Sequence, residues 1–245
     1  STSNLLLCPI NFFDILNLIC PGLIAIIIIF GLSSFFKSKR HSGEWSSTVA
    51  VQKDKLMAKA KRISVILGVW GRANKLWDEK NIKETAKNTF LKLQASWEKR
   101  DYTEMQPLMV KSLYEEHVAQ LDSMKARHEI NKLEGLKLLD MQIVLVKNYY
   151  KDRKDEFTVW LQAQARDIII DDRTSKKIRG DVGIGTFEEF WTLRREDNQW
   201  KLIKITQPEE GMSVLNQENF DAISTEGMVE RVEDKAGGQK TKNLK

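Results

Sequence analysis

Four side chains of types that can move protons lie in the regularly patterned part of the chain: Tyr102, His117, Asp140 and Asp167. General acid–base chemistry needs such groups within hydrogen-bond reach of one substrate. His117 stands between Leu113 and Leu121 on an apolar helical face, which favours a histidine hydrogen-bonded inside a core. The direction of Asp167 stays open, because Ile168–Ile170 break the alternation of its strand. These residues are catalytic candidates, each with a structural alternative.

Other chemical signatures are absent from the sequence. It contains no P-loop, GxGxxG fingerprint or GxSxG elbow, and the glycines of GDVGIG, residues 180–185, lack the Lys and Ser/Thr of a phosphate loop. Asp171 and Asp172 end a strand pattern, so we interpret them as turn residues rather than metal ligands. Cys8 and Cys20 have neither CxxC spacing nor a histidine cluster. We therefore expect no catalytic residue, no metal site and no cofactor.

An uncharged run of 22 residues, 15–36, reads ILNLICPGLIAIIIIFGLSSFF. About 20 apolar residues in a helix cross the hydrocarbon core of a bilayer. A signal peptide would carry positive charge before such a run, whereas here Lys37, Lys39 and Arg40 follow it. We therefore expect a transmembrane helix over residues 15–36 after a short tail, residues 1–14. The positive-inside rule then places the rest of the chain in the mitochondrial matrix or, alternatively, in a bacterial cytoplasm.

Positive charge is concentrated in the next segment, which we expect to be a basic connector over residues 37–77. Between Lys37 and Arg72 there are nine Lys and Arg but only two acidic residues. A stripe at helical spacing runs through this segment: Val49, Leu56, Met57, Ala60, Ile63, Leu67 and Trp70. The cations expected to contact anionic lipid are Lys37, Lys39, Arg40, Lys53, Lys55, Lys59, Lys61 and Arg62. The alternatives are a helix packed on the domain and, through residues 37–72, a nucleic-acid partner.

The rest of the pattern predicts helices first and strands afterwards. One helical stripe comprises Ile82, Ala86, Phe90, Leu93 and Trp97. A break near Pro107 separates this helix from a second one over residues 111–128. After Gly135 the period changes to two, and short turns join four strands into an antiparallel meander. We therefore expect an α+β domain over residues 78–208 with its helices on one face of the sheet, followed by a flexible tail, residues 209–245.

Three stretches of the chain resemble the Tim44-like domain family. In the first, residues 89–121, the family pattern F-x-x-x-Q-x-x-W and the acidic residue after it correspond to Phe90, Gln94, Trp97 and Asp101. The second, residues 157–181, resembles the long central strand and turn of the family, and the third, residues 187–207, resembles its closing hairpin. Leu193 stands where phenylalanine is commoner. The resemblance covers residues 78–208.

This resemblance implies a cone-shaped domain, similar to nuclear transport factor two, with a role at a membrane. The best-known members lie on the matrix face of the mitochondrial inner membrane, where one tethers the import motor and a relative tethers the mitoribosome. Bacterial members are usually membrane-associated. The implied function is a membrane-anchored, non-catalytic adaptor or accessory subunit at an energy-transducing inner membrane. Its implied partners are membrane lipid and protein subunits of an inner-membrane or ribosomal assembly.

Two alternatives to the adaptor remain at this point. One is an accessory subunit integral to a respiratory-chain complex. The other is a small-molecule-binding or isomerase-type enzyme of the same cone fold, because ketosteroid isomerase-like relatives place an aspartate base and acidic donors inside the cone. Such an enzyme would draw on the four proton-moving candidates named above. In one respect the chain departs from the import-motor protein: an expected spanning helix stands where that protein has its chaperone-binding region.

The stretch FWTLRREDNQWKLIKI, residues 190–205, predicts the closing hairpin of the sheet. A two-residue turn at Asp197 and Asn198 pairs Arg195 with Trp200. One face then carries Trp191, Leu193, Trp200 and Leu202, and the other carries Phe190, Thr192, Ile203 and Ile205. Because both faces are apolar, one packs on the helices and the other needs a partner, another segment or an apolar ligand. The expected pocket or docking face comprises Phe90, Trp97, Trp160, Trp191, Leu193 and Trp200.

Overall fold

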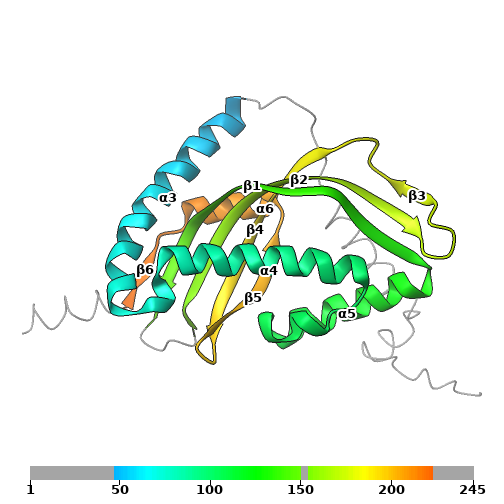
Figure 1. Ribbon diagram of the computed structural model, residues 1–245. Helices are drawn as coiled ribbons and strands as arrows, with labels where there is room; N and C mark the ends of the chain where they lie inside the picture. Colours follow the sequence, from blue (N-terminus) through cyan, green and yellow to red (C-terminus); the bar gives the residue numbers. More distant parts are fainter. Residues whose placement is uncertain (1–46, 150–153, 223–245) are drawn as a thin grey trace, which may run out of the picture. The chain divides into compact units, whose positions relative to one another are not determined.

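The computed structural model describes residues 47–149 and 154–222, which belong to one compact unit (Figure 1). The predicted transmembrane helix, residues 15–36, lies outside the described residues, and so do Lys37, Lys39 and Arg40. Among the helices that the structure describes, none is long and apolar enough to cross a membrane.

Three helical elements open the described part of the chain: α3 (Ser47–Ala73), η1 (Lys75–Trp77) and α4 (Glu79–Lys99). Side chains cap the turns between them: Asn74 Oδ1 accepts a hydrogen bond from Leu76 N at 3.0 Å, and Asp78 Oδ1 accepts one from Asn81 N at 3.1 Å. Gly71 allows the close approach of this turn, because a Cβ there would lie 3.1 Å from the Cα of Asp78. The predicted stripe of α4 is confirmed, since all five of its apolar side chains are buried.

The remaining elements are η2 (Thr103–Leu108), α5 (Lys111–Ala126), β1 (Glu129–Asn148), β2 (Glu156–Asp171), β3 (Lys177–Gly180), β4 (Gly185–Glu196), β5 (Gln199–Thr206), α6 (Pro208–Gly211), η4 (Met212–Asn216) and β6 (Phe220–Asp221). The strand order is β5-β4-β2-β1-β6, with β3 paired to β2. The four long strands form the predicted antiparallel meander, but β6 is parallel to β1. The α+β class is therefore confirmed, whereas the predicted four-stranded sheet is corrected to a curled, mixed sheet of six strands. The two added strands have only four and two residues, too few for a period of two to be visible.

The first face of the sheet packs on α4. The ring of Phe90 meets the ring of Trp191 edge-on at a centroid distance of 5.4 Å. Trp200 contacts Phe157 at 4.8 Å and Trp77 of η1 at 5.0 Å, again edge-on. Aromatic pairs in this arrangement contribute about 0.5–1.5 kcal/mol beyond the area they bury. The sequence pattern left open which face meets the helices, and the structure shows that it is the face of Trp191 and Trp200.

The second face of the sheet is covered by two other segments of the same chain. Leu56 of α3 and Leu215 of η4 form a buried cluster with Val144, Trp160 and Phe190 on the strands. Helical elements therefore cover both faces, which corrects the prediction that they lie on one face. The sequence analysis left three occupants open for this face: a partner, another segment of the chain or an apolar ligand. The structure shows that another segment of the chain covers it.

The closing hairpin, β4–β5, pairs Arg195 with Trp200, which confirms the predicted turn. Farther from the turn, a bulge after Thr192 shifts the register by one residue. Trp191 then lies opposite Ile205, so the two side chains share one face, and the predicted placement of Ile205 on the other face is wrong. A bulge adds a residue to one strand only, and an uninterrupted alternation does not reveal it.

Residues 208–222 fold back onto the sheet instead of leaving it. Gly211 lies so close to Phe190 that a Cβ would overlap the phenylalanine ring, and Leu215 is buried. Strand β6 pairs Phe220 with Lys147 at the end of β1. The predicted flexible tail is therefore wrong up to residue 222, and the remainder of that segment lies outside the described residues.

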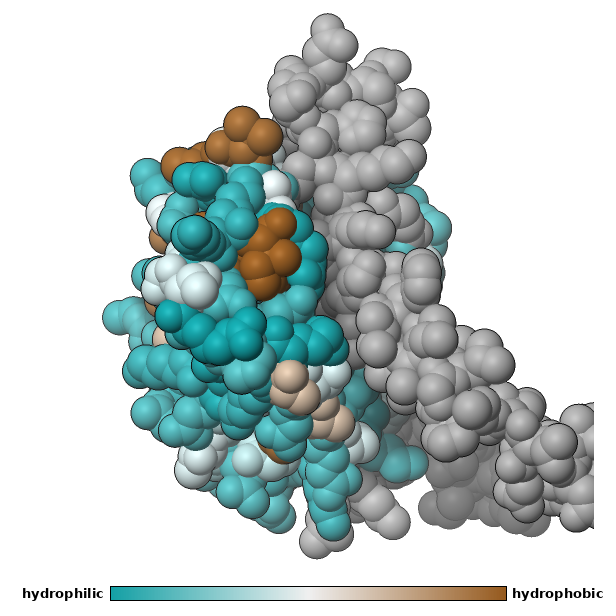
Figure 2. All heavy atoms as spheres, turned by 90° about the vertical axis from the view of Figure 1, so that its right-hand side faces the viewer, coloured by the Kyte–Doolittle hydropathy of each residue, from teal (hydrophilic) through white to brown (hydrophobic). Residues whose placement is uncertain are grey.

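The surface of the described chain carries two groups of exposed apolar side chains. One lies on α3 and comprises Met57, Val65 and Val69, and the other lies on β3 and the loop after it and comprises Ile178, Val182 and Ile184. Figure 2 views the molecule from the side of β3 and shows separate apolar patches on a mainly hydrophilic surface. Neither group takes part in the packing of the two sheet faces.

Candidate functional site

Helix α3 has an inward face and an outward face. Four side chains of the predicted stripe are buried against the domain: Leu56, Ala60, Ile63 and Leu67. Met57, which was assigned to the same stripe, is instead 41% exposed. It begins a row at intervals of four residues that continues through Lys61, Val65 and Val69, and we call these four residues the outward ridge. Val65 and Val69 are 71% and 64% exposed. A helix face that meets only water carries mainly polar side chains, so two largely exposed valines call for another explanation.

Cations flank the outward ridge. Lys61 belongs to it, and Arg62 and Arg72 are exposed beside it, whereas the acidic residue of the described α3 is Asp54, nearer the N-terminal end. The ridge therefore combines apolar side chains with positive charge. This combination matches the interface of an anionic membrane, where apolar groups enter the headgroup boundary and cations meet phosphates.

Two of the lysines predicted to contact lipid instead donate hydrogen bonds to other residues of the protein. Lys59 is buried, and its Nζ donates hydrogen bonds to the carbonyl oxygens of Val214, at 2.7 Å, and Gln217. Lys55 Nζ donates to Asn216 Oδ1 at 2.5 Å. Burial, followed by the nearby Arg62, lowers the pKa of Lys59 to about 8. Lys59 is therefore corrected from a lipid contact to a tie between α3 and η4.

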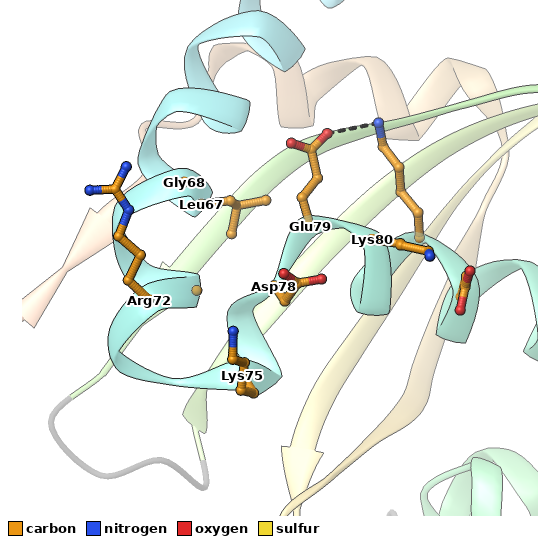
Figure 3. A pocket seen from close by; sticks show the side chains of 10 residues that line it. Leu67, Gly68, Arg72, Lys75, Asp78, Glu79 and Lys80 are labelled. Atoms are coloured by element: carbon orange, nitrogen blue, oxygen red, sulfur yellow. Dashed lines mark ion pairs between the residues drawn. The ribbon is translucent and has the colours of Figure 1, made fainter.

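A cleft of about 580 Å³ lies where the C-terminal end of α3 meets the start of α4 (Figure 3). Its charged lining comprises Arg72, Lys75, Asp78, Glu79, Lys80, Lys83 and Glu84. Glu79 pairs with Lys83 at 2.8 Å and accepts a hydrogen bond from Ser64 at 2.6 Å. Cations and carboxylates thus face one another across an open cleft, and this arrangement selects neither an anion nor a cation.

Two of the proton-moving candidates meet in the core. Tyr102 Oη lies 2.7 Å from His117 Nδ1, and the ring of His117 meets Trp97 edge-on at 5.6 Å. Burial raises the pKa of Tyr102 and lowers the pKa of His117 to about 4, so both groups are neutral at pH 7. His117 is 4% exposed, and neither residue lines the cleft described above. These contacts match the structural alternative given for His117, which is a histidine hydrogen-bonded inside the core.

The two aspartate candidates have structural contacts of their own. Asp167 accepts a hydrogen bond from the Asn131 amide, and its backbone pairs with Asp181. Asp140 Oδ1 accepts from Met141 N at 2.7 Å and from Gln142 Nε2 at 2.8 Å. Neither aspartate lines the cleft. Across residues 47–149 and 154–222, no group of three or more His, Cys, Asp or Glu is placed to hold a metal ion.

The expected docking face lies inside the folded unit. All six of its side chains are buried: Phe90, Trp97, Trp160, Trp191, Leu193 and Trp200. Trp160 faces the cluster with Leu56, whereas Trp191 faces α4, so the six lie on two sides of the sheet. The structure therefore places them in the core, and a docking role for them stays a prediction.

Comparison with known proteins gives a family match and a likeness to solved structures. The family model for the Tim44-like domain matches residues 71–207, which is more than half of the chain. No curated protein matches the chain. The crystal structure of the intermembrane space region of the chloroplast protein ARC6 is 14% identical, with 51% of this chain and 94% of that chain covered and a TM-score of 0.36. That structural likeness is too distant to carry an argument. The family match is sufficient, and it shows that this chain belongs to the Tim44-like domain family.

Proposed function

We propose that this protein is a membrane-associated, non-catalytic interaction module whose outward ridge rests on an anionic membrane surface. The Tim44-like domain family is associated with protein-interaction roles at membranes, which supports the general part of the proposal. The observation that carries the specific part is the exposure of Val65 and Val69 beside Lys61, Arg62 and Arg72. These side chains are free for an interface because the opposite face of α3 already supplies the packing with the sheet.

The expected strength of this contact is modest. Each Lys or Arg held near an anionic surface contributes about 1 kcal/mol. Moving a largely exposed valine out of water contributes on the order of 1–2 kcal/mol. A ridge with two valines, one methionine and three nearby cations is therefore sufficient for reversible contact, but a lasting attachment needs a second anchor. The predicted transmembrane helix, residues 15–36, and the cations Lys37, Lys39 and Arg40 would supply that anchor.

The proposed partners are membrane lipid and the protein subunits of an assembly at the same membrane. The side of the membrane would be the mitochondrial matrix or a bacterial cytoplasm, as the positive-inside rule predicts from Lys37, Lys39 and Arg40. Gentle solubilisation of the native membrane tests the protein-binding part of the proposal. Co-purification with subunits of an import, ribosomal or respiratory assembly is expected, and a protein that purifies alone would contradict it.

A fluorescent probe tests the lipid-binding part. Removing α3 would not be a clean test, because Leu56 and Ile63 belong to the core. Instead, an environment-sensitive fluorophore is attached to a cysteine at position 65 in the full chain, with Cys8 and Cys20 replaced by serine. We expect a blue shift with vesicles of phosphatidylcholine and phosphatidylglycerol, and a smaller shift with phosphatidylcholine alone.

Charge reversal supplies the control for this probe. Lys61→Glu together with Arg62→Glu should abolish most of the blue shift, because both cations lie beside the ridge. The matched pair Lys87→Glu and Lys99→Glu changes two exposed lysines of α4 and should leave the shift intact. An equal loss in both pairs would show that only net charge matters, and the ridge would then have no specific role.

A further inference from the structure

The segment of residues 212–221 passes along α3 to the end of β1, and we call it the strap. It comprises η4 and β6, and Figure 1 shows β6 beside the C-terminal half of α3. Leu215 of the strap belongs to the buried cluster with Leu56 of α3. Val146 N of β1 donates a hydrogen bond to Asn219 Oδ1 at 3.2 Å. The strap is therefore held on one side by α3 and on the other by β1.

The amine of Lys59 lies at the interface between α3 and the strap. Its Nζ donates hydrogen bonds to the carbonyl oxygens of Val214, at 2.7 Å, and Gln217, and the residue is only 6% exposed. Buried charges in proteins are normally paired with an opposite charge. Among the residues that the structure describes, no carboxylate forms an ion pair with Lys59, so its two partners are neutral carbonyl groups.

The hydrogen-bond partners of Lys59 match a neutral amine. A protonated lysine has three N–H donors, whereas a neutral amine has two. The described residues provide two acceptors for Lys59, which are the carbonyl oxygens of Val214 and Gln217. A neutral amine places both of its N–H groups on these carbonyls, but a protonated amine keeps a third buried N–H without an acceptor in the described chain. A buried donor without a partner is costly, because it has given up its hydrogen bond to water.

The charges around Lys59 act in the same direction. Burial lowers the pKa of Lys59 most, and Arg62 and Lys55 of the same helix lower it further, as does Lys147 of β1. Together they bring this pKa to about 8. The three cations belong to the two elements that hold the strap, so like charges meet the amine from both sides.

The strap carries two carboxylates, and neither of them pairs with Lys59. Glu218 is exposed and forms no ion pair with another described residue. Asp221 accepts hydrogen bonds from Trp70 Nε1 at 3.1 Å and from Asn148 Nδ2 at 3.2 Å. The strap therefore covers the amine of Lys59 without bringing it a counter-charge, and the covered amine gives up its proton more readily than an amine in water.

We propose that the strap is a proton-sensitive latch, which closes more tightly when the Lys59 amine is neutral and opens more readily when this amine is protonated. The open strap leaves the amine in water, whereas the closed strap buries it against two carbonyls and among cations. Opening also removes Leu215 from the second face of the sheet, so the proton on Lys59 controls access to the cluster around Trp160 and Phe190. The latch acts within the domain and does not require the proposed membrane contact.

The direction of the pH dependence follows from two pKa values. Lys59 has a pKa of about 8 under the closed strap, whereas the ordinary value for lysine is 10.5. Between these values the open strap leaves the amine protonated and the closed strap does not, so raising the pH favours the closed strap. Below pH 8 both states hold the proton, and the pH dependence fades. The ratio of closed to open strap should therefore rise about tenfold between pH 7 and pH 9.

Amide hydrogen exchange in the full chain between pH 7 and pH 9 tests the latch. The probes are the N–H of Gln217, which donates to the Val214 carbonyl at 3.1 Å, and the N–H of Val146, which donates to Asn219. The rate of an unstructured peptide at the same pH, divided by each measured rate, gives a protection factor. We expect both protection factors to rise about tenfold over this range. Protection that stays constant or falls as the pH rises would overturn the proposal.

Replacing the titrating group supplies the first comparison. Lys59→Met has no amine to titrate, so protection in the strap should be lower and should lose the tenfold rise. Lys87→Met, at an exposed position of α4, is the matched control and should keep the rise. A rise that persists in Lys59→Met would assign the pH dependence to another group and would contradict the latch.

A second variant leaves every hydrogen bond of Lys59 in place. Lys147→Gln removes one cation that acts on the amine, so it should raise the pKa of Lys59 and reduce the rise in protection between pH 7 and pH 9. Lys137→Gln, at an exposed position of the same strand, should change neither quantity. The nitrogen chemical shift of the Lys59 amine measures its pKa directly, and a pKa near the ordinary 10.5 in the unaltered chain would rule out the latch.

Discussion

The hydroxyl of Tyr102 lies 2.7 Å from Nδ1 of His117, and both side chains are buried between α4, η2 and α5. The hydrogen bond joins two neutral groups, because burial lowers the pKa of His117 to about 4 and raises the pKa of Tyr102. An imidazole in this position contributes to the fold only while it is neutral. The pair therefore makes stability depend on pH.

Acidification should destabilise the protein through His117. Its pKa is about 4 in the folded state, below the ordinary value of 6.5, so the unfolded state takes up the proton first as pH falls. The contribution of the neutral imidazole is complete above pH 6.5 and is lost as pH falls toward 4, with a total of about 3 kcal/mol. Urea unfolding across this range measures the loss. In His117→Gln, whose side chain does not titrate, this part of the pH dependence should disappear, and an unchanged dependence would show that other groups cause it.

Shortening Leu56 should destabilise the whole unit. Leu56 is buried in the cluster between α3 and the second face of the sheet, so Leu56→Ala should lower the free energy of unfolding by about 2–5 kcal/mol. Val65 lies on the opposite side of the same helix, and Val65→Ala should change that free energy by less than about 0.5 kcal/mol. Chemical denaturation of the two variants gives the comparison. Equal effects would mean that α3 does not pack on the sheet as described.

Gly180 should tolerate no side chain. Its φ of 118° and its contact with β2 predict that Gly180→Ala costs at least about 1–3 kcal/mol and loosens the loop that carries Val182. Gly183 in the same loop has open space around it and should accept alanine with little effect. Amide exchange at Asp181 reports the loosening, because its N–H donates to the Asp167 carbonyl. Protection that survives in Gly180→Ala would contradict this account of the loop.

Removing the amine of Lys59 should release the C-terminal segment. Lys59→Met keeps an unbranched side chain, one atom shorter, but leaves the carbonyls of Val214 and Gln217 without this donor, and we expect a loss of about 1–3 kcal/mol. Amide exchange in residues 214–217 should rise at the same time. Lys87→Met, at an exposed position of α4, is the matched control and should leave both quantities unaltered. If both variants behave alike, the tie between α3 and η4 contributes no stability.

Strong local periodicity explains which parts of the fold were predictable. The α4 stripe from Ile82 to Trp97 repeats over four turns, and all its members are buried as expected. The turn at Asp197 and Asn198 was also predictable, because two residues of this kind accept the positive φ values, 50° and 62°, that a tight hairpin requires.

The corrections share a different physical origin, which is tertiary packing. The bulge after Thr192 and the docking of Leu215 depend on which segments meet in space, and no local pattern contains that information. Lys59 could not be distinguished by sequence from its exposed neighbours, because its partners lie about 155 residues away. The sequence did contain a signal for the outward ridge, because Met57, Val65 and Val69 fall in a row at intervals of four residues. Lys61 occupies one position of that row and interrupts its apolar pattern.

Spin-label accessibility along α3 tests the central claim most directly. Nitroxides are placed singly at positions 65 and 69 on the outward ridge and at Ser112, an exposed residue of α5, in the full chain with Cys8 and Cys20 replaced by serine. With vesicles of phosphatidylcholine and phosphatidylglycerol, positions 65 and 69 should collide more with oxygen, which concentrates in lipid, than with a water-soluble nickel complex. Position 112 should show the opposite order. If positions 65 and 69 are as accessible to the nickel complex as position 112, the outward ridge does not rest on the membrane.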